Sequence, residues 1–228
     1  MARRRPAPRP QALHPERAYA AVIGDLVASR RVADRAALQE RLETVLREAS
    51  RSTAAVQAFA PTLGDEFQGV FASLPLALRA ALEVRFALGG GVEIRFGIGW
   101  GRIPVSRRRR SPFAQDGPAW WAARAALDRV REAEKGIRRP SGWRMGFAAE
   151  SELPEGPYLE ALTIALDALI FRFRDADRTI ALGLLRGEPQ KSIARRLRVT
   201  PSAVAQRASA KGLHSIRELL EVLGAVAA

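Results

Sequence analysis

Two aspartates stand where their side chains could share a cation. Asp25 follows the short apolar run Tyr19–Ile23, which predicts a buried strand. Asp65 lies in a Gly-Asp turn between two β-rich runs, which predicts a hairpin. In a split β-α-β sheet the first strand lies beside this hairpin, so both carboxylates would emerge at one sheet edge. Carboxylates on rigid strands suit Mg²⁺, so we expect a magnesium site at Asp25 and Asp65, although a Gly-Asp pair can also be only a turn.

The glycines that precede these aspartates fit the same hypothesis. Gly24 and Gly64 have no side chain, so phosphate oxygens could approach the backbone there. A pair of metal ions held beside them could activate a hydroxyl and neutralise a leaving pyrophosphate. The spacing therefore suggests nucleotide binding with Mg²⁺ at this edge.

The elements that must position these residues follow from hydrophobic periodicity. Between residues 19 and 148 the pattern predicts the order β-α-β-β-α-β-α-β. Helices are expected at Arg35–Ala49, Leu74–Leu88 and Pro118–Glu134. This order contains the split β-α-β arrangement of a ferredoxin-like sheet with helices on one face.

The pattern changes after residue 150, because only helices are predicted from Pro157 onwards. The sequence therefore predicts an α+β chain in which an all-α helix-turn-helix domain follows the ferredoxin-like domain. The expected parts are a disordered basic tail at 1–17, a sheet domain at 18–150 and a helical domain at 157–228.

Residues 187–213 have the pattern of a helix-turn-helix. A first helix is expected at Pro189–Leu197, followed by a turn at residues 198–200. Thr200 is a favourable N-cap and Pro201 a favourable first-turn residue for a second helix that reaches about Lys211. The segment resembles the helix-turn-helix of LuxR-type regulators and of the last region of sigma factors. A plain helical bundle with a solvated basic face is the alternative.

The resemblance implies that the second helix faces the major groove of double-stranded DNA. Gln can read adenine, Arg can read guanine, and basic side chains around the motif can contact phosphates. The candidate DNA-binding residues are Lys191, Arg195, Arg196, Ser202, Ala203, Gln206, Arg207 and Lys211.

Composition agrees with a polyanionic partner. The chain has 228 residues and a formal net charge of +13, which suits nucleic acid or a phosphorylated ligand. The absence of cysteine excludes a disulfide scaffold and a thiol nucleophile and fits a reducing compartment, so we expect a cytoplasmic protein. No stretch approaches the ~18 apolar residues of a membrane span, and the basic N-terminus is not a secretory signal.

Several motifs occur in the order typical of one family. Residues 21–30 (AVIGDLVASR) and 62–69 (TLGDEFQG) carry the two Gly-Asp pairs. Residues 95–101 (RFGIGWG) and 116–124 (DGPAWWAAR) follow. Together these segments, spread over Tyr19–Phe147, resemble the SatD family.

The same segments are more distantly similar to class III nucleotidyl cyclases and GGDEF diguanylate cyclases. That similarity implies metal binding by Asp25 and Asp65, adds Glu66 as a metal or acid/base candidate, and assigns Arg124 a phosphate contact during catalysis. Pro61 and Trp120 replace a purine-reading Lys and a phosphate-orienting Asn, which argues against a standard cyclase.

Two functions of different classes follow, and a phosphate-binding scaffold without turnover is a third option. The first is a DNA-binding transcription regulator of SatD type whose cyclase-like domain binds a nucleotide with a divalent metal or mediates dimerisation. The second is an enzyme of nucleotidyl cyclase or nucleotidyltransferase type that acts on nucleoside triphosphates. Because related catalytic domains often build their site between two chains, we also expect a homodimer through the cyclase-like domain.

Overall fold

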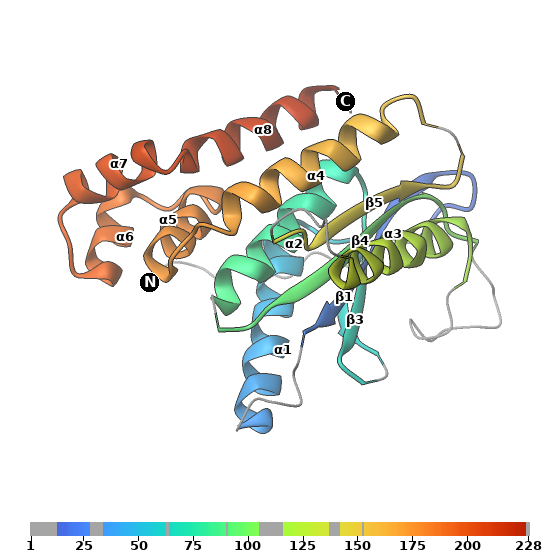
Figure 1. Ribbon diagram of the computed structural model, residues 1–228, viewed down its shortest axis with the longest axis horizontal. Helices are drawn as coiled ribbons and strands as arrows, with labels where there is room; N and C mark the ends of the chain where they lie inside the picture. Colours follow the sequence, from blue (N-terminus) through green and yellow to red (C-terminus); the bar gives the residue numbers. More distant parts are fainter. Residues whose placement is uncertain are drawn as a thin grey trace.

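The computed structural model describes residues 13–27, 34–62, 64–89, 91–104, 116–136, 142–151 and 153–226. Five strands form one sheet (Figure 1). The strands are β1 (Ala18–Leu26), β2 (Gln57–Pro61), β3 (Glu66–Phe71), β4 (Ile94–Arg102) and β5 (Met145–Ala149).

Helices connect the strands and make up the rest of the chain. The helices are α1 (Arg35–Ser52), α2 (Leu74–Leu88), α3 (Pro118–Lys135), α4 (Gly156–Ile170), α5 (Asp175–Leu185), α6 (Gln190–Leu197), α7 (Pro201–Ala210) and α8 (Leu213–Val226). The longest of these, α1 and α3, have 18 residues each and carry charges along their length. Within the described residues, no helix has both the length and the apolar character needed to cross a membrane.

The sheet has the strand order β2-β3-β1-β4-β5. The central strand β1 pairs antiparallel with β3 and with β4, and β5 lies parallel to β4 at the far edge. This order is that of a ferredoxin-like sheet extended by one strand, so the predicted α+β class is confirmed.

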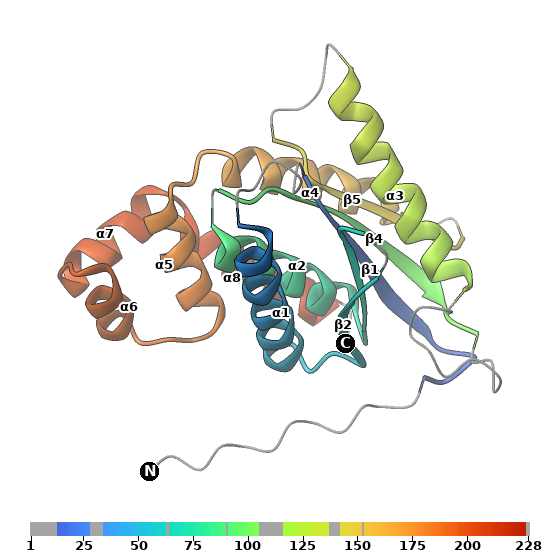
Figure 2. The same ribbon diagram turned by 90° about the horizontal axis from the view of Figure 1, so that it is seen from below.

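Both faces of the sheet are covered by helices. Side chains of β1 alternate between the two faces and so belong to two different cores. Ala20 and Val22 belong to the core shared with α1 and α2. Tyr19, Ala21 and Ile23 belong to a second core beneath α3. Figure 2 shows α1 and α2 on one side of the sheet and α3 on the other. The prediction of helices on one face therefore holds for α1 and α2 and is wrong for α3.

Glycines of β4 and β5 allow α3 to lie directly on the sheet. A Cβ atom added to Gly97 would lie 2.0 Å from the Ala123 carbonyl oxygen, and one added to Gly99 would lie 2.1 Å from that of Ala119. Gly146 of β5 has a similar contact with the backbone of α3. The helix backbone occupies the space that side chains would need.

The C-terminal helices share the core of the sheet. Ile170, Ile180 and Leu184 belong to the same buried cluster as Phe96 of β4. A buried ion pair between Arg85 of α2 and Asp167 of α4 also joins the two parts. The change from strands to helices lies between β5 and α4, where the sequence predicts it, but the packing is continuous across it.

The predicted basic tail lies partly beyond what the structure describes. Residues 1–12 of this tail are outside the described ranges. Residues 13–17 form a turn, in which the backbone N–H of His14 donates to the hydroxyl of Tyr19. The Arg17 guanidinium lies 5.6 Å from the centre of the Tyr19 ring. This part of the predicted disordered tail therefore packs against β1.

Candidate functional site

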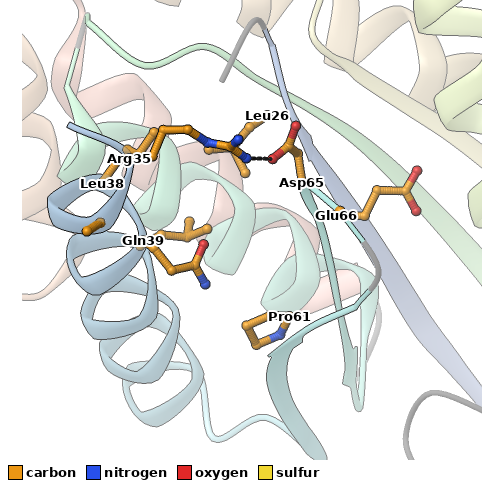
Figure 3. A pocket seen from close by; sticks show the side chains of 10 residues that line it. Leu26, Arg35, Leu38, Gln39, Pro61, Asp65 and Glu66 are labelled. Atoms are coloured by element: carbon orange, nitrogen blue, oxygen red, sulfur yellow. Dashed lines mark ion pairs between the residues drawn. The ribbon is translucent and has the colours of Figure 1, made fainter. Parts of the chain in front are cut away.

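Asp25 and Asp65 contact different arginines in the structure. Asp25 is the register partner of Glu66 in β3 and of Arg95 in β4, and all three point to the face covered by α3. Asp65 precedes Glu66 by one residue and points to the other face, where it lies 3.6 Å from Arg35 of α1 (Figure 3). Asp65 lies in the turn just before β3, so the strand register places Glu66 beside Asp25 and leaves a shared magnesium site at Asp25 and Asp65 as a prediction.

An arginine lies where two carboxylates do converge. The Arg131 guanidinium of α3 is 3.2 Å from Asp25 Oδ1 and 2.9 Å from Glu66 Oε1. Asp25 also accepts a hydrogen bond of 2.7 Å from Arg95. The carboxylate pair at this edge is thus Asp25 with Glu66, and its bridging cation is a guanidinium. For Mg²⁺ to bind between them, Arg131 would have to leave.

Arg124 differs from the expectation of a free phosphate contact. One terminal nitrogen donates a hydrogen bond of 2.8 Å to Oε1 of Glu66, and the other donates one of 2.8 Å to Oε2. This bidentate pair raises the pKa of Arg124 and, with help from Arg131, lowers the pKa of Glu66 below its usual value. Both residues predicted to be catalytic are therefore engaged with each other.

The ion pairs continue along the strand ends as a network. Arg95 also pairs with Glu134 of α3, and this hydrogen bond is the largest cause of the raised pKa of Arg95. Arg144 joins Glu134 to Glu93, at 2.9 Å from each. Arg95, Arg131 and Glu134 are not among the predicted site residues, because partners this far apart in the chain are revealed only by strand register and helix placement.

The two glycines have roles other than admitting phosphate. A Cβ atom on Gly24 would lie 2.1 Å from the ring of Phe67, so this glycine makes room for a core aromatic side chain. Gly64 has a φ of +74° with open space around it, as a tight hairpin turn requires. Packing of Phe67 therefore explains Gly24, and a phosphate contact at the Gly24 backbone stays a prediction.

A cavity of about 280 Å³ lies between α1 and the β2–β3 turn (Figure 3). Its polar lining includes Arg35, Gln39 and Asp65, and its apolar lining includes Leu38 and Pro61. Arg35 and Asp65 balance each other's charge there. Among the described residues, no group of three or more His, Asp or Glu side chains is placed to hold a metal ion.

The helices α6 and α7 form with the predicted caps. Ile193, Ala194, Val204 and Ala208 are buried between them and the rest of the helical part. The turn residue Arg198 is left-handed at φ 57°, and α7 begins at Pro201. The Thr200 hydroxyl accepts a hydrogen bond of 3.1 Å from the backbone N–H of Ala203.

Most predicted DNA-binding side chains of this segment are exposed. The exposed members are Lys191, Arg195, Arg196, Ser202, Ala203, Gln206 and Lys211. Arg196 lies 2.9 Å from Glu188, so part of its charge is neutralised.

Arg207 is the exception. Its Nε donates a hydrogen bond of 2.6 Å to Asp177 Oδ1 on α5, and the Asp177 side chain is fully buried. Arg207 is thus partly exposed and paired inside the protein, and its contact with DNA stays a prediction. The pattern of buried residues in α7 does not reveal the pair, because Asp177 lies on another helix.

The fold defines an α+β protein whose ferredoxin-like sheet is followed by a bundle of helices. The chain matches the SatD family over residues 19–141, more than half of its 228 residues. It therefore belongs to the SatD family. No curated protein sequence matches it.

Solved structures include distant neighbours. A bacterial light-regulated adenylyl cyclase has a TM-score of 0.44 and 12% identity, over 60% of this chain and 45% of that one. The guanylyl cyclase Cya2 has a TM-score of 0.33 and 14% identity, over 50% of this chain and 70% of that one. A regulator of polyketide synthase expression from Bifidobacterium adolescentis has a TM-score of 0.30 and 15% identity, over 92% and 86%. The chain thus spans less than half of the adenylyl cyclase.

Proposed function

We propose that this SatD-family protein is a DNA-binding transcription regulator that contacts duplex DNA through α6 and α7. The observation that carries the proposal is the exposed surface of α7. Ser202, Ala203 and Gln206 are all exposed at helical spacing, and none of them is charged. Exposed basic side chains flank them, among them Lys191, Arg195 and Lys211.

This arrangement provides the two kinds of contact that DNA recognition requires, those to phosphates and those to base edges. Basic side chains at the rim contact phosphates and supply affinity for any sequence. A small or amide-bearing surface on the inserted helix reads base edges, and Gln206 has both a donor and an acceptor for adenine. The Thr200 hydroxyl accepts a hydrogen bond from one backbone N–H in the first turn of α7 and so stabilises the end of the helix that the proposal places at DNA.

The test compares charge removal at two places on the full chain. The variant Lys191→Gln/Arg195→Gln removes two charges beside α7, and Arg47→Gln/Lys135→Gln removes two from exposed surfaces of α1 and α3. Binding to fluorescent duplexes is measured by anisotropy at several salt concentrations. The first variant should weaken binding to every sequence and reduce the slope of log K against log salt by up to about two, since each phosphate contact releases roughly one counterion. The control should bind as the wild type does.

Two results would count against the proposal. If the wild-type chain binds no duplex with salt-sensitive affinity, the basic surface is only solvated, and the enzyme hypothesis takes precedence. If both variants weaken binding equally, the net charge of the chain rather than α6 and α7 attracts DNA.

We propose further that the sheet part pairs two chains, so that two copies of α7 meet two half-sites of a palindrome. Of the adjacent tryptophans, Trp120 is buried, whereas Trp121 is 62% exposed on the outer side of α3. A large exposed aromatic side chain of this kind is enriched at interfaces. Light scattering at micromolar concentration should give twice the chain mass, and Trp121→Ser should shift the protein towards monomer. A monomeric wild type would remove this proposal.

A further inference from the structure

Arg207 and Asp177 form an ion pair that joins α7 to α5. The Asp177 side chain has no exposed surface, and its Oδ1 accepts the hydrogen bond of 2.6 Å from Arg207 Nε. Its Oδ2 accepts a second one of 2.9 Å from the backbone N–H of Arg174, at the start of α5. Both carboxylate oxygens are thus used inside the protein.

The carboxylate is ionised in this setting. Burial by itself raises the pKa of Asp177, but the hydrogen bonds from Arg207 and from the Arg174 backbone outweigh it and hold the pKa below its usual value. A buried charge of this kind depends on its partner, because an unpaired one is costly to bury. Arg207 is therefore held to one position by a partner that cannot move into solvent.

The helix that carries Asp177 is itself fixed to the sheet part. α5 packs on α2. Arg186, which follows α5, lies 3.0 Å from the buried Glu83 of α2, and Arg79 of α2 donates to the Leu185 carbonyl at 2.8 Å. Asp177 is thus a fixed point against which α7 is set.

Arg207 lies next to the exposed recognition surface of α7. Arg207 follows Gln206 directly in the sequence. A contact that fixes the position of Arg207 therefore fixes the rotation of α7 about its own axis, and with it the direction in which Gln206 points. Val204 and Ala208 supply the apolar contacts of the buried face of α7, and the pair with Asp177 adds a directional contact on the same helix.

We infer that the Arg207–Asp177 pair positions α7 for sequence-specific recognition, and that Arg207 itself does not read DNA. This inference rests on the proposed function, since it assigns the orientation of the same DNA-contacting surface. Ser202, Ala203 and Gln206 then carry the base contacts, and Arg207 acts through them.

The test uses three variants of the full chain: Arg207→Gln, Asp177→Asn and the double variant. Asn at 177 keeps an acceptor for the Arg174 backbone N–H and removes only the charge. A preferred duplex is first selected from random sequences, and the ratio of its affinity to that of an unrelated duplex is measured at several salt concentrations. Each single variant should lower the ratio by about tenfold, the scale of one lost base contact. The salt slope should not change, because no phosphate contact is lost.

The double variant separates positioning from direct contact. If the two residues act only as a pair, the double variant should be no worse than the more damaging single variant. Arg207→Lys, which leaves the buried carboxylate with a cation, should fold and should have a ratio closer to that of the wild type than Arg207→Gln has. If Arg207→Gln and Asp177→Asn unfold, Arg207→Lys still allows the inference to be tested.

Two outcomes for the affinity ratios of these variants would overturn the inference. If Asp177→Asn leaves the ratio unchanged while Arg207→Gln lowers both the ratio and the salt slope, Arg207 contacts DNA directly. A ratio that Arg207→Lys fails to improve would also overturn it. Failure of the proposed function is distinguishable, because then the wild-type chain itself binds no duplex.

Discussion

Arg131 lies between Asp25 and Glu66, in the place that a metal ion shared by these two carboxylates would take. We predict that Arg131→Ala binds Mg²⁺ more tightly than the wild type, because the change removes the guanidinium that contacts both carboxylates and leaves Asp25 paired with Arg95 and Glu66 paired with Arg124. Isothermal titration with Mg²⁺ measures the difference, and Arg131→Lys, which keeps the positive charge, should behave as the wild type does. Equal affinity in Arg131→Ala and the wild type would show that the site does not accept a metal even when it is vacated.

Glu66 makes the stability of the protein depend on acid. Its pKa is lowered chiefly by Arg124, so its contribution is present above its unfolded value of about 4.3 and is lost as the pH falls through the lower folded value. Because Arg124 is 43% exposed, we discount the pair for solvent screening and expect Glu66→Gln to cost about 1 kcal/mol at pH 7. Urea unfolding should show the difference shrinking below about pH 4.

Glu132 provides a matched control for that measurement. It lies on the same helix as Arg124 but pairs with Lys135 on the surface, where both side chains are at least 70% exposed. Glu132→Gln should leave the pH dependence unchanged. A constant difference between Glu66→Gln and the wild type from pH 7 to pH 3 would contradict an ionised pair at Glu66.

The contact between α3 and β4 depends on glycine. We predict that Gly99→Ala destabilises the protein by about 1–3 kcal/mol or more, because the new methyl group meets helix backbone, which cannot rotate away as a side chain can. Chemical unfolding measures the loss. Gly91→Ala is the control, since nothing lies within 4 Å of its added Cβ and its backbone is not left-handed. A loss in Gly91→Ala as large as that in Gly99→Ala would mean that the close approach of α3 is not the cause.

The complete chain should unfold in one step. The hydrophobic cluster runs from the sheet through α4 and α5 to α8, and the buried Arg85–Asp167 pair lies across the predicted boundary. All four tryptophans lie before residue 150, so their fluorescence reports on the sheet part, whereas far-ultraviolet circular dichroism reports on all helices. The two signals should change together with urea. Separate transitions would instead support an independent helical domain at 157–228.

Local interactions made much of the fold predictable from the sequence. The apolar run of β1 and the periodicity of α2 depend on residues close in the chain. The start of α7 is the clearest case, because Thr200 caps and Pro201 initiates the helix through contacts within one turn. The motifs at residues 21–30 and 62–69 likewise indicated the family that the comparison found.

The composition of the candidate site was decided only by the tertiary structure. The sequence determined that carboxylates would stand at the ends of β1 and of the hairpin. Strand register then placed Glu66, and not Asp65, beside Asp25, since a shift of one residue moves a side chain to the opposite face. Arg131 reaches Asp25 across 106 residues of sequence, and Arg207 reaches Asp177 on another helix. Such partners are chosen by the packing of whole elements, and the properties of neighbouring residues do not contain that information.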